Sequence, residues 1–218
     1  MSEDYGCPVR ALRDLVPAEA WEELTRYPSW TYEADQRLLE QGTEGTHVLA
    51  LTEGMVKVVR GDRDGRQRLL AFRGPGEILG EMALQDGGRR LADVWAMSRC
   101  RAAKVPAEDF HRFVLRHGLA YPLAALASRR LREQTEAGDG SVHERLAMAL
   151  LRLVEASGGT RSFSLTRPLL AQHIGVGRNS VTKALARLGP GRVIATKNRI
   201  EVTSVEGLRS VLGGPVSA

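Results

Sequence analysis

The sequence predicts an α+β protein with three consecutive parts: an antiparallel β unit, a long helix and a small basic helix–turn–helix unit. Three observations support this prediction. Short apolar runs separated by turn residues fill positions 30–105, and an apolar repeat of helical spacing follows at about 119–136. The charge then changes, because residues 1–140 contain 20 Lys/Arg and 22 Asp/Glu, whereas residues 141–218 contain 11 and 4. A basic unit on a nearly neutral body indicates a nucleic-acid partner for that unit alone.

The composition sets limits on the class of protein. At 218 residues and 43% hydrophobic content, the chain can form one large domain or two modest ones. It has no run of 18 apolar residues, and its first residues lack the basic and apolar regions of a signal peptide, so we expect a cytoplasmic location. Cys7 and Cys100 are too few for a four-cysteine site and are expected to be free thiols. We therefore expect no metal, no iron–sulfur cluster and no haem.

The β unit is predicted from many short strands at regular spacing. Residues 8–27 are expected to form a helical packing segment in front of it. Apolar runs then appear at 47–51, 55–59 and 68–72, with glycine-containing turns between them. Further runs follow at 91–96 and 102–105. This arrangement favours an antiparallel sandwich or barrel.

One segment, residues 76–96, interrupts this series of strands. It combines glycines with apolar residues, which predicts a tight turn, a short helix and a loop that returns into a strand at Leu91. Backbone N–H groups at such a helix start bind anions, and Arg90 could close on a phosphate with two parallel hydrogen bonds. Glu81, nine residues earlier, could accept a hydrogen bond from a sugar hydroxyl. The alternative is a surface ion pair in a structural turn.

The long helix is predicted to pair with a second copy of itself. A three-four repeat of mostly apolar side chains would form a narrow seam, typical of helix pairing. Its members are Leu119, Leu123, Leu126, Ala127, Arg130, Leu131 and Gln134. The alternative is a helix that packs only on its own sheet. Residues 138–140, Gly-Asp-Gly, are expected to end the helix as a hinge.

The basic unit has the spacing of a DNA-reading helix–turn–helix. Ala171 is the small residue of the first helix, Gly175 the turn glycine and Val181 the branched residue that faces back from the second helix. Runs at 193–195 and 200–202 predict a hairpin with a basic tip. Arginine pairs with guanine, asparagine with adenine, and lysine with guanine or phosphate. The candidate DNA contacts are Thr166, Arg167, Arg178, Asn179, Ser180, Lys183, Lys197 and Arg199.

The motif Gly80-Glu81-Met-Ala-Leu … Arg90-Leu91-Ala92-x-Val94-x-Ala96 resembles the cyclic-nucleotide-binding cassette. With the helix–turn–helix behind it, the chain from 30 to about 205 resembles the cyclic AMP receptor protein/FNR (CRP/FNR) family of bacterial transcription regulators. The resemblance implies a β-roll joined by a dimerisation helix to a winged helix–turn–helix domain. It places the domains at 1–117, 118–140 and 141–218.

The resemblance also implies roles for particular residues. Gly80 and Glu81 would hold the ribose, Arg90 the cyclic phosphate, and Gln134 and Thr135 the base. The complete expected ligand set is Gly80, Glu81, Met82, Ala83, Arg90, Leu91, Ala92, Gln134 and Thr135. Leu91 stands where bacterial members often have serine or threonine, so one hydroxyl donor to the phosphate is missing. Asn179 and Lys183 stand where glutamate and arginine are usual, which predicts a different half-site preference.

The function implied is that of a homodimeric DNA-binding transcription regulator controlled by cyclic AMP. The expected partners are palindromic double-stranded DNA, a second copy of the chain and RNA polymerase, with no membrane. The alternatives are control by cyclic GMP or a cyclic dinucleotide, and DNA binding without any nucleotide. An enzyme is not expected, because the sequence has no Ser/His/Asp set or phosphate-cleaving motif. His111 and His117 are interpreted as surface residues.

Overall fold

The computed structural model describes residues 11–62, 65, 67–136 and 138–213. The chain divides after Glu133 into two compact units, which we call the β unit and the basic unit. Cys7, the start of the predicted 8–27 helix and the chain beyond Gly213 lie outside the described residues. None of the helices in the described ranges is both long and apolar enough to cross a membrane.

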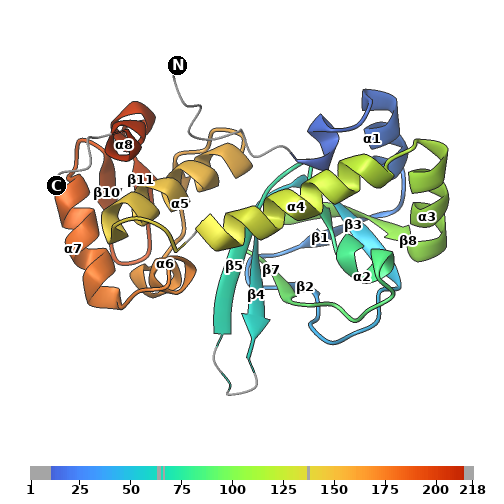
Figure 1. The fold of residues 1–218 in the computed structure, drawn as a ribbon, viewed down its shortest axis with the longest axis horizontal. Helices are drawn as coiled ribbons and strands as arrows, with labels where there is room; N and C mark the ends of the chain where they lie inside the picture. Colours follow the sequence, from blue (N-terminus) through green and yellow to red (C-terminus); the bar gives the residue numbers. More distant parts are fainter. Residues whose placement is uncertain (1–10, 63–64, 66, 137, 214–218) are drawn as a thin grey trace. The chain divides into compact units, whose positions relative to one another are not determined.

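The β unit consists of two four-stranded antiparallel sheets with helices on one side (Figure 1). One sheet has the order β1-β8-β3-β6 and the other the order β2-β7-β4-β5. The strands are β1 (Ser29–Tyr32), β2 (Arg37–Leu39), β3 (His47–Glu53), β4 (Val56–Gly61), β5 (Gln67–Arg73), β6 (Ile78–Leu79), β7 (Asp93–Ala96) and β8 (Cys100–Pro106). The predicted antiparallel β-roll is therefore confirmed.

Strand β3 explains how this unit is held together, because both of its faces are buried. Leu49 and Leu51 pack into a core shared by the two sheets, whereas Val48 and Ala50 pack into a second core under the helices. Successive side chains of a strand point to opposite faces, so a strand covered on both sides reads as a continuous apolar run. The buried free thiol of Cys100 belongs to the core between the sheets.

The helical side contains η1 (Leu12–Asp14), α1 (Ala18–Thr25), α3 (Ala107–Arg116) and α4 (Ala120–Glu136). The helical segment predicted over 8–27 consists, in the described residues, of a 3-10 turn followed by α1. Pro17 separates the two, since proline has no N–H and favours a helix start. Phe110 and Phe113 of α3 are buried with Leu12 and Leu24 in the core beneath α4.

Much of the predicted seam of α4 faces the β unit itself and is not available to a second copy of the chain. Leu119, Leu123 and Leu126 are buried in the core of their own β unit. The exposed side of α4 carries a different stripe, Tyr121, Ala124, Ser128 and Leu131, also at three-four spacing. Tyr121 is 83% and Leu131 67% exposed. Spacing alone identifies apolar faces but does not say which of them the β unit itself covers.

The basic unit is a small α+β domain. It contains α5 (Val142–Ala156), β9 (Ser162–Phe163), α6 (Arg167–His173), α7 (Arg178–Leu188), β10 (Val193–Ala195), β11 (Ile200–Val202) and α8 (Val205–Leu212). The strands form an antiparallel sheet in the order β10-β11-β9. Ala171 and Val181 are buried, and Gly175 adopts a φ of +65° in the turn between α6 and α7. The predicted helix–turn–helix with its hairpin is confirmed.

Candidate functional site

The segment expected to bind a ligand begins with a tight turn at Gly80, between β6 and the short helix α2 (Glu81–Gln85). Gly80 has a φ of +86°, a conformation that favours glycine. A Cβ at this position would overlap with Nη1 of Arg90, so a larger residue would displace that guanidinium. The absence of a side chain at Gly80 therefore allows Arg90 to pack against the start of α2.

Arg90 is a buried cation held by backbone carbonyl groups. Its side chain donates to the carbonyl oxygen of His47 at 2.7 Å and to that of Gly80 at 3.5 Å. The residue is only 5% exposed, and within the described part of the chain it forms no ion pair. Burial lowers the pKa of Arg90, and the charge of Glu81 acts in the opposite direction. An arginine stays protonated in such a place, so the site presents a positive charge that has no direct counter-ion among the described residues.

The imidazole of His47 is neutral beside this cation. Burial, together with the positive charges of Lys104 and Arg90, lowers the pKa of His47 to about 4. At neutral pH, Arg90 therefore supplies the positive charge at this position and His47 does not.

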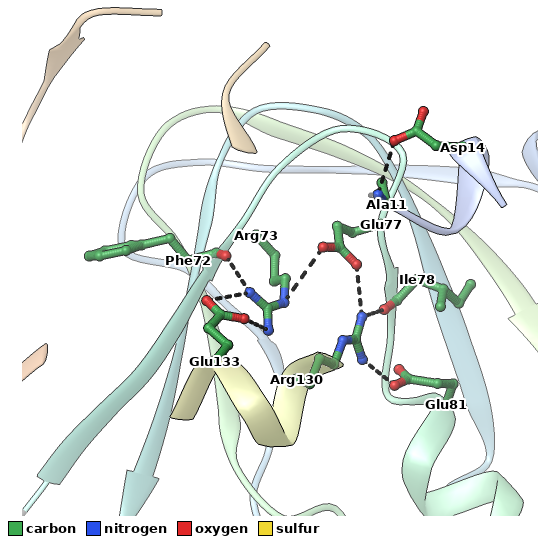
Figure 2. A network of polar contacts seen from close by, with 9 residues as sticks. All are labelled: Ala11, Asp14, Phe72, Arg73, Glu77, Ile78, Glu81, Arg130 and Glu133. Carbon is green, nitrogen blue, oxygen red and sulfur yellow. Dashed lines mark hydrogen bonds and ion pairs between the residues drawn. The ribbon is translucent and has the colours of Figure 1, made fainter. Parts of the chain in front are cut away.

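Glu81 does not face Arg90 as a direct ion-pair partner; its carboxylate instead binds Arg130 of α4 (Figure 2). Arg130 also donates to Glu77 at 2.8 Å and to the carbonyl oxygen of Ile78 at 2.9 Å. Burial alone would lower the pKa of Arg130, but the carboxylates of Glu81 and Glu77 raise it above its usual range. The structure thus brings a residue of the predicted seam into the predicted ligand site.

Sequence reasoning missed this buried charge cluster, which comprises Arg73, Glu77, Glu81, Arg130 and Glu133. Arg73 holds Glu133 with two hydrogen bonds of 3.2 and 2.8 Å. One signal was present in the sequence: Arg130 lies one helical turn before Gln134, a residue expected to face the ligand. The pairing of Arg73 with Glu133, sixty residues apart, had no such signal.

The other expected ligand residues have varied surroundings. Ala83 is buried, Met82 is 38% and Leu91 48% exposed. Leu91 and Ala92 lie in the loop before β7, which begins at Asp93 and not at Leu91 as predicted. Gln134 and Thr135 are exposed on the last turn of α4, after the division between the units.

A separate pocket of about 360 Å³ lies beside α2. It is lined by Glu44, Gly45, Ala83, Leu84, Gly87, Gly88, Arg89 and His111. Of the expected ligand set it includes Ala83 alone, so it is distinct from the position of Arg90. His111 is exposed as expected, and its Nε2 lies 3.1 Å from the carbonyl oxygen of Leu84. His117 is half-buried and lies 2.8 Å from a carboxylate oxygen of Glu23, so it is not a free surface residue.

On the basic unit, the side chains at the start of α7 are available to a partner. Arg178, Asn179 and Lys183 are exposed, and Ser180 is half-buried. Lys197 is exposed at the tip of the β10–β11 hairpin. Arg199, on the same hairpin, is exposed as well.

The remaining members of this set also have structural partners. Thr166 caps α6, its hydroxyl oxygen accepting from the N–H of Leu169 at 3.4 Å. Arg167 donates to the carbonyl oxygen of Ala195, and Arg199 donates to the hydroxyl of Ser162 at 2.6 Å. Both arginines therefore help to hold the hairpin in place.

Comparison with known proteins shows two family matches in the order of the two units. Residues 29–117 match the model of the cyclic nucleotide-binding domain, and residues 144–211 match that of the Crp-like helix-turn-helix domain. The chain is 33% identical over 192 residues to the cyclic AMP receptor protein of Thermus thermophilus, covering 82% of this chain and 88% of that protein. This chain belongs to the CRP/FNR family of transcription regulators. Its relatives in this family are transcriptional regulators and not enzymes, so this chain is a regulator too.

Solved structures of CRP/FNR proteins support the same fold. The catabolite activator protein of Thermus thermophilus is 30% identical, with a TM-score of 0.51 over 92% of this chain and 97% of that one. The regulator CLP of Xanthomonas campestris is 19% identical, with a TM-score of 0.66 over 86% of this chain and all of that one. These structures show the shared fold, and the two family models make the chain a CRP-family transcription regulator with a cyclic nucleotide-binding domain.

Proposed function

We propose that this CRP/FNR regulator is cytoplasmic and binds cyclic AMP in the β unit, and that the nucleotide controls its binding to promoter DNA and RNA polymerase. The observation that carries the ligand proposal is the buried guanidinium of Arg90, which lacks a carboxylate partner among the described residues. A buried charge is costly unless an opposite charge compensates it. A cyclic phosphate provides one such charge, in bidentate geometry.

The rest of the nucleotide would extend from Arg90 along α2. The backbone of Gly80 to Ala83 and the loop at Leu91 and Ala92 would surround the phosphate and ribose, with a sugar hydroxyl donating to Glu81. Because Glu81 already accepts from Arg130, the hydroxyl would share this carboxylate with the arginine. Gln134 and Thr135 would contact the base. Leu91 offers no hydroxyl donor, so the phosphate depends on Arg90 and backbone N–H groups.

Calorimetric titration separates the candidate ligands. We expect cyclic AMP to bind more tightly than cyclic GMP or cyclic di-GMP, at a stoichiometry of one nucleotide per chain. The cyclic dinucleotide is included because CLP is described as c-di-GMP responsive. Binding of none of the three would favour the alternative, a CRP-type regulator that binds DNA without a nucleotide.

We further propose that two copies associate through the exposed stripe of α4. Leu131, the last residue of this stripe, is 67% exposed, and burying such a side chain stabilises an interface. We expect Leu131→Arg to convert a dimer into a monomer in sedimentation experiments. Leu115→Arg is the matched control, because Leu115 is 82% exposed and belongs to α3, not to the stripe. A monomeric wild-type protein, or a dimeric Leu131→Arg variant, would contradict the proposal.

A dimer would place two copies of α7 on successive turns of DNA, about 34 Å apart, and read a palindromic site. We expect Arg178→Ala to weaken binding to a duplex selected from random DNA by the wild-type protein by about 10-fold or more, because a bidentate base contact is worth roughly 1–3 kcal/mol. Lys183→Ala should instead reduce the salt dependence of binding by about one unit. Arg209→Ala, on α8, is the control. Unchanged affinity and sequence preference in Arg178→Ala would exclude this role.

A further inference from the structure

Arg73 lies between two elements that it joins through carboxylates (Figure 2). On one side, its Nη atoms bind both carboxylate oxygens of Glu133, near the end of α4. On the other, its Nε lies 3.6 Å from Glu77, in the turn that leads into β6. The side chain of Arg73 is 6% exposed and that of Glu77 5%, so water does not screen these contacts strongly.

Glu77 is shared between two arginines. One of its carboxylate oxygens faces Arg73, and the other accepts from Arg130 at 2.8 Å. Arg130 in turn binds Glu81, the first residue of α2. The five side chains therefore form a continuous series in the order Glu133, Arg73, Glu77, Arg130, Glu81. Among the described residues, Arg73 is linked to Glu81 through Glu77 and Arg130, and the charge of Glu133 also acts on Arg130.

The series has three carboxylates for two guanidinium groups, so each arginine serves more than one acid. Removing one charge from such a buried group leaves its partners uncompensated, and the neighbours must rearrange. A change at Glu81 therefore alters how strongly Arg130 binds Glu77 relative to Glu81. That change in turn alters how strongly Glu77 competes with Glu133 for Arg73.

We propose that Arg73 is a positioning residue that couples the ligand-binding helix α2 to the end of α4. A ligand hydroxyl on Glu81 weakens the hold of Glu81 on Arg130 and draws Glu77 away from Arg73. Arg73 then binds Glu133, the last residue before the chain divides, more completely. The coupling acts equally in the reverse direction, because linkage between two sites is reciprocal. Only the statement that a ligand contacts Glu81 rests on the proposed function.

Hydrogen exchange of the full chain without ligand tests this coupling. We expect Arg73→Met to increase amide exchange about tenfold in two separate segments, 129–135 of α4 and 81–86 of α2, relative to β3. Arg60→Met is the matched control, because Arg60 lies on the same β4–β5 hairpin and is 49% exposed. Faster exchange in α4 with no change in α2 would overturn the proposal, and so would equal acceleration in β3, which reports global destabilisation.

The double variant Arg73→Met/Glu133→Met distinguishes coupling from simple neutralisation of Glu133. Two methionines restore a packed contact without a charge, so exchange in 129–135 should return toward wild type. Exchange in 81–86 should stay raised, because Glu77 has still lost Arg73. Its return to the wild-type rate would show that Arg73 serves only to neutralise Glu133, and would reject the proposal.

A second readout uses cyclic AMP as the probe. DNA affinity is measured with cyclic AMP at about 1 mM, well above the Kd of a micromolar ligand, and again without nucleotide. The ratio of these two affinities should fall toward one in Arg73→Met, while the calorimetric affinity for cyclic AMP changes less. If cyclic AMP does not change the DNA affinity of the wild-type protein, the proposed function alone is contradicted, since the exchange experiment needs no ligand. A wild-type ratio in Arg73→Met would contradict the coupling role alone.

Discussion

Arg90→Ala is expected to abolish the rise in melting temperature that cyclic AMP produces in the wild-type protein. At a nucleotide concentration of about 100 times Kd, binding to the folded state alone stabilises it by roughly 2.7 kcal/mol. For a chain of this length, that corresponds to a rise of roughly 5–10 °C. Arg90→Ala removes the proposed counter-charge for the phosphate, so we expect no rise. The measurement is thermal unfolding with and without nucleotide, each variant compared with itself.

The comparison within each variant matters, because Arg90→Ala also removes hydrogen bonds to the carbonyl groups of His47 and Gly80. Its melting temperature without ligand should therefore fall. Arg89→Ala is the matched control: the neighbouring arginine is exposed and donates to the carbonyl oxygen of Gly42. We expect Arg89→Ala to keep the full ligand-induced rise. An unaltered rise in Arg90→Ala would show that the phosphate binds elsewhere.

Arg130→Met is expected to destabilise the β unit by about 3–5 kcal/mol, because it leaves buried carboxylates without their shared partner. Glu77 and Glu81 are 4% and 3% exposed, so water cannot replace the lost guanidinium. Urea unfolding followed by tryptophan fluorescence measures this effect. Trp21, Trp30 and Trp95 are the protein's three tryptophans, and all of them lie in the β unit. The signal therefore reports on this unit alone.

The matched control is Arg132→Met, an exposed arginine two residues further along α4. Surface substitutions of this kind usually change stability by no more than about 0.5 kcal/mol. If the free energy of unfolding falls as little in Arg130→Met as in the control, the cluster contributes little to folding. Comparison of the two variants also removes any general effect of replacing arginine by methionine on helix propensity.

Much of the fold could be predicted because its signals are local. The positions of Ala171, Gly175 and Val181 lie within eleven residues, and the turn between two helices requires those residue types directly. The continuous apolar run of β3 and the glycine turns between strands are local in the same sense. Gly80 is a further example, because its left-handed φ favours glycine.

The candidate site was predicted only in part. The residues Glu81 and Arg90 were expected to face one anion together, but the structure pairs Glu81 with Arg130 and leaves Arg90 with carbonyl oxygens. The contact between Glu81 and Arg130 spans 49 residues, and that between Arg73 and Glu133 spans 60. No periodicity in the sequence indicates contacts between residues so far apart along the chain. Arginine can pair with any of the acidic residues that the fold brings within reach.

The sequence by itself determined the antiparallel β unit, the helix–turn–helix and the cassette with its glycine turn, since each depends on residues close together in the chain. The tertiary structure alone decided which face of α4 packs inward and which acids hold Arg73 and Arg130. The physical reason is that an apolar stripe or a charge is compatible with several partners. The choice among them depends on which groups folding removes from water together.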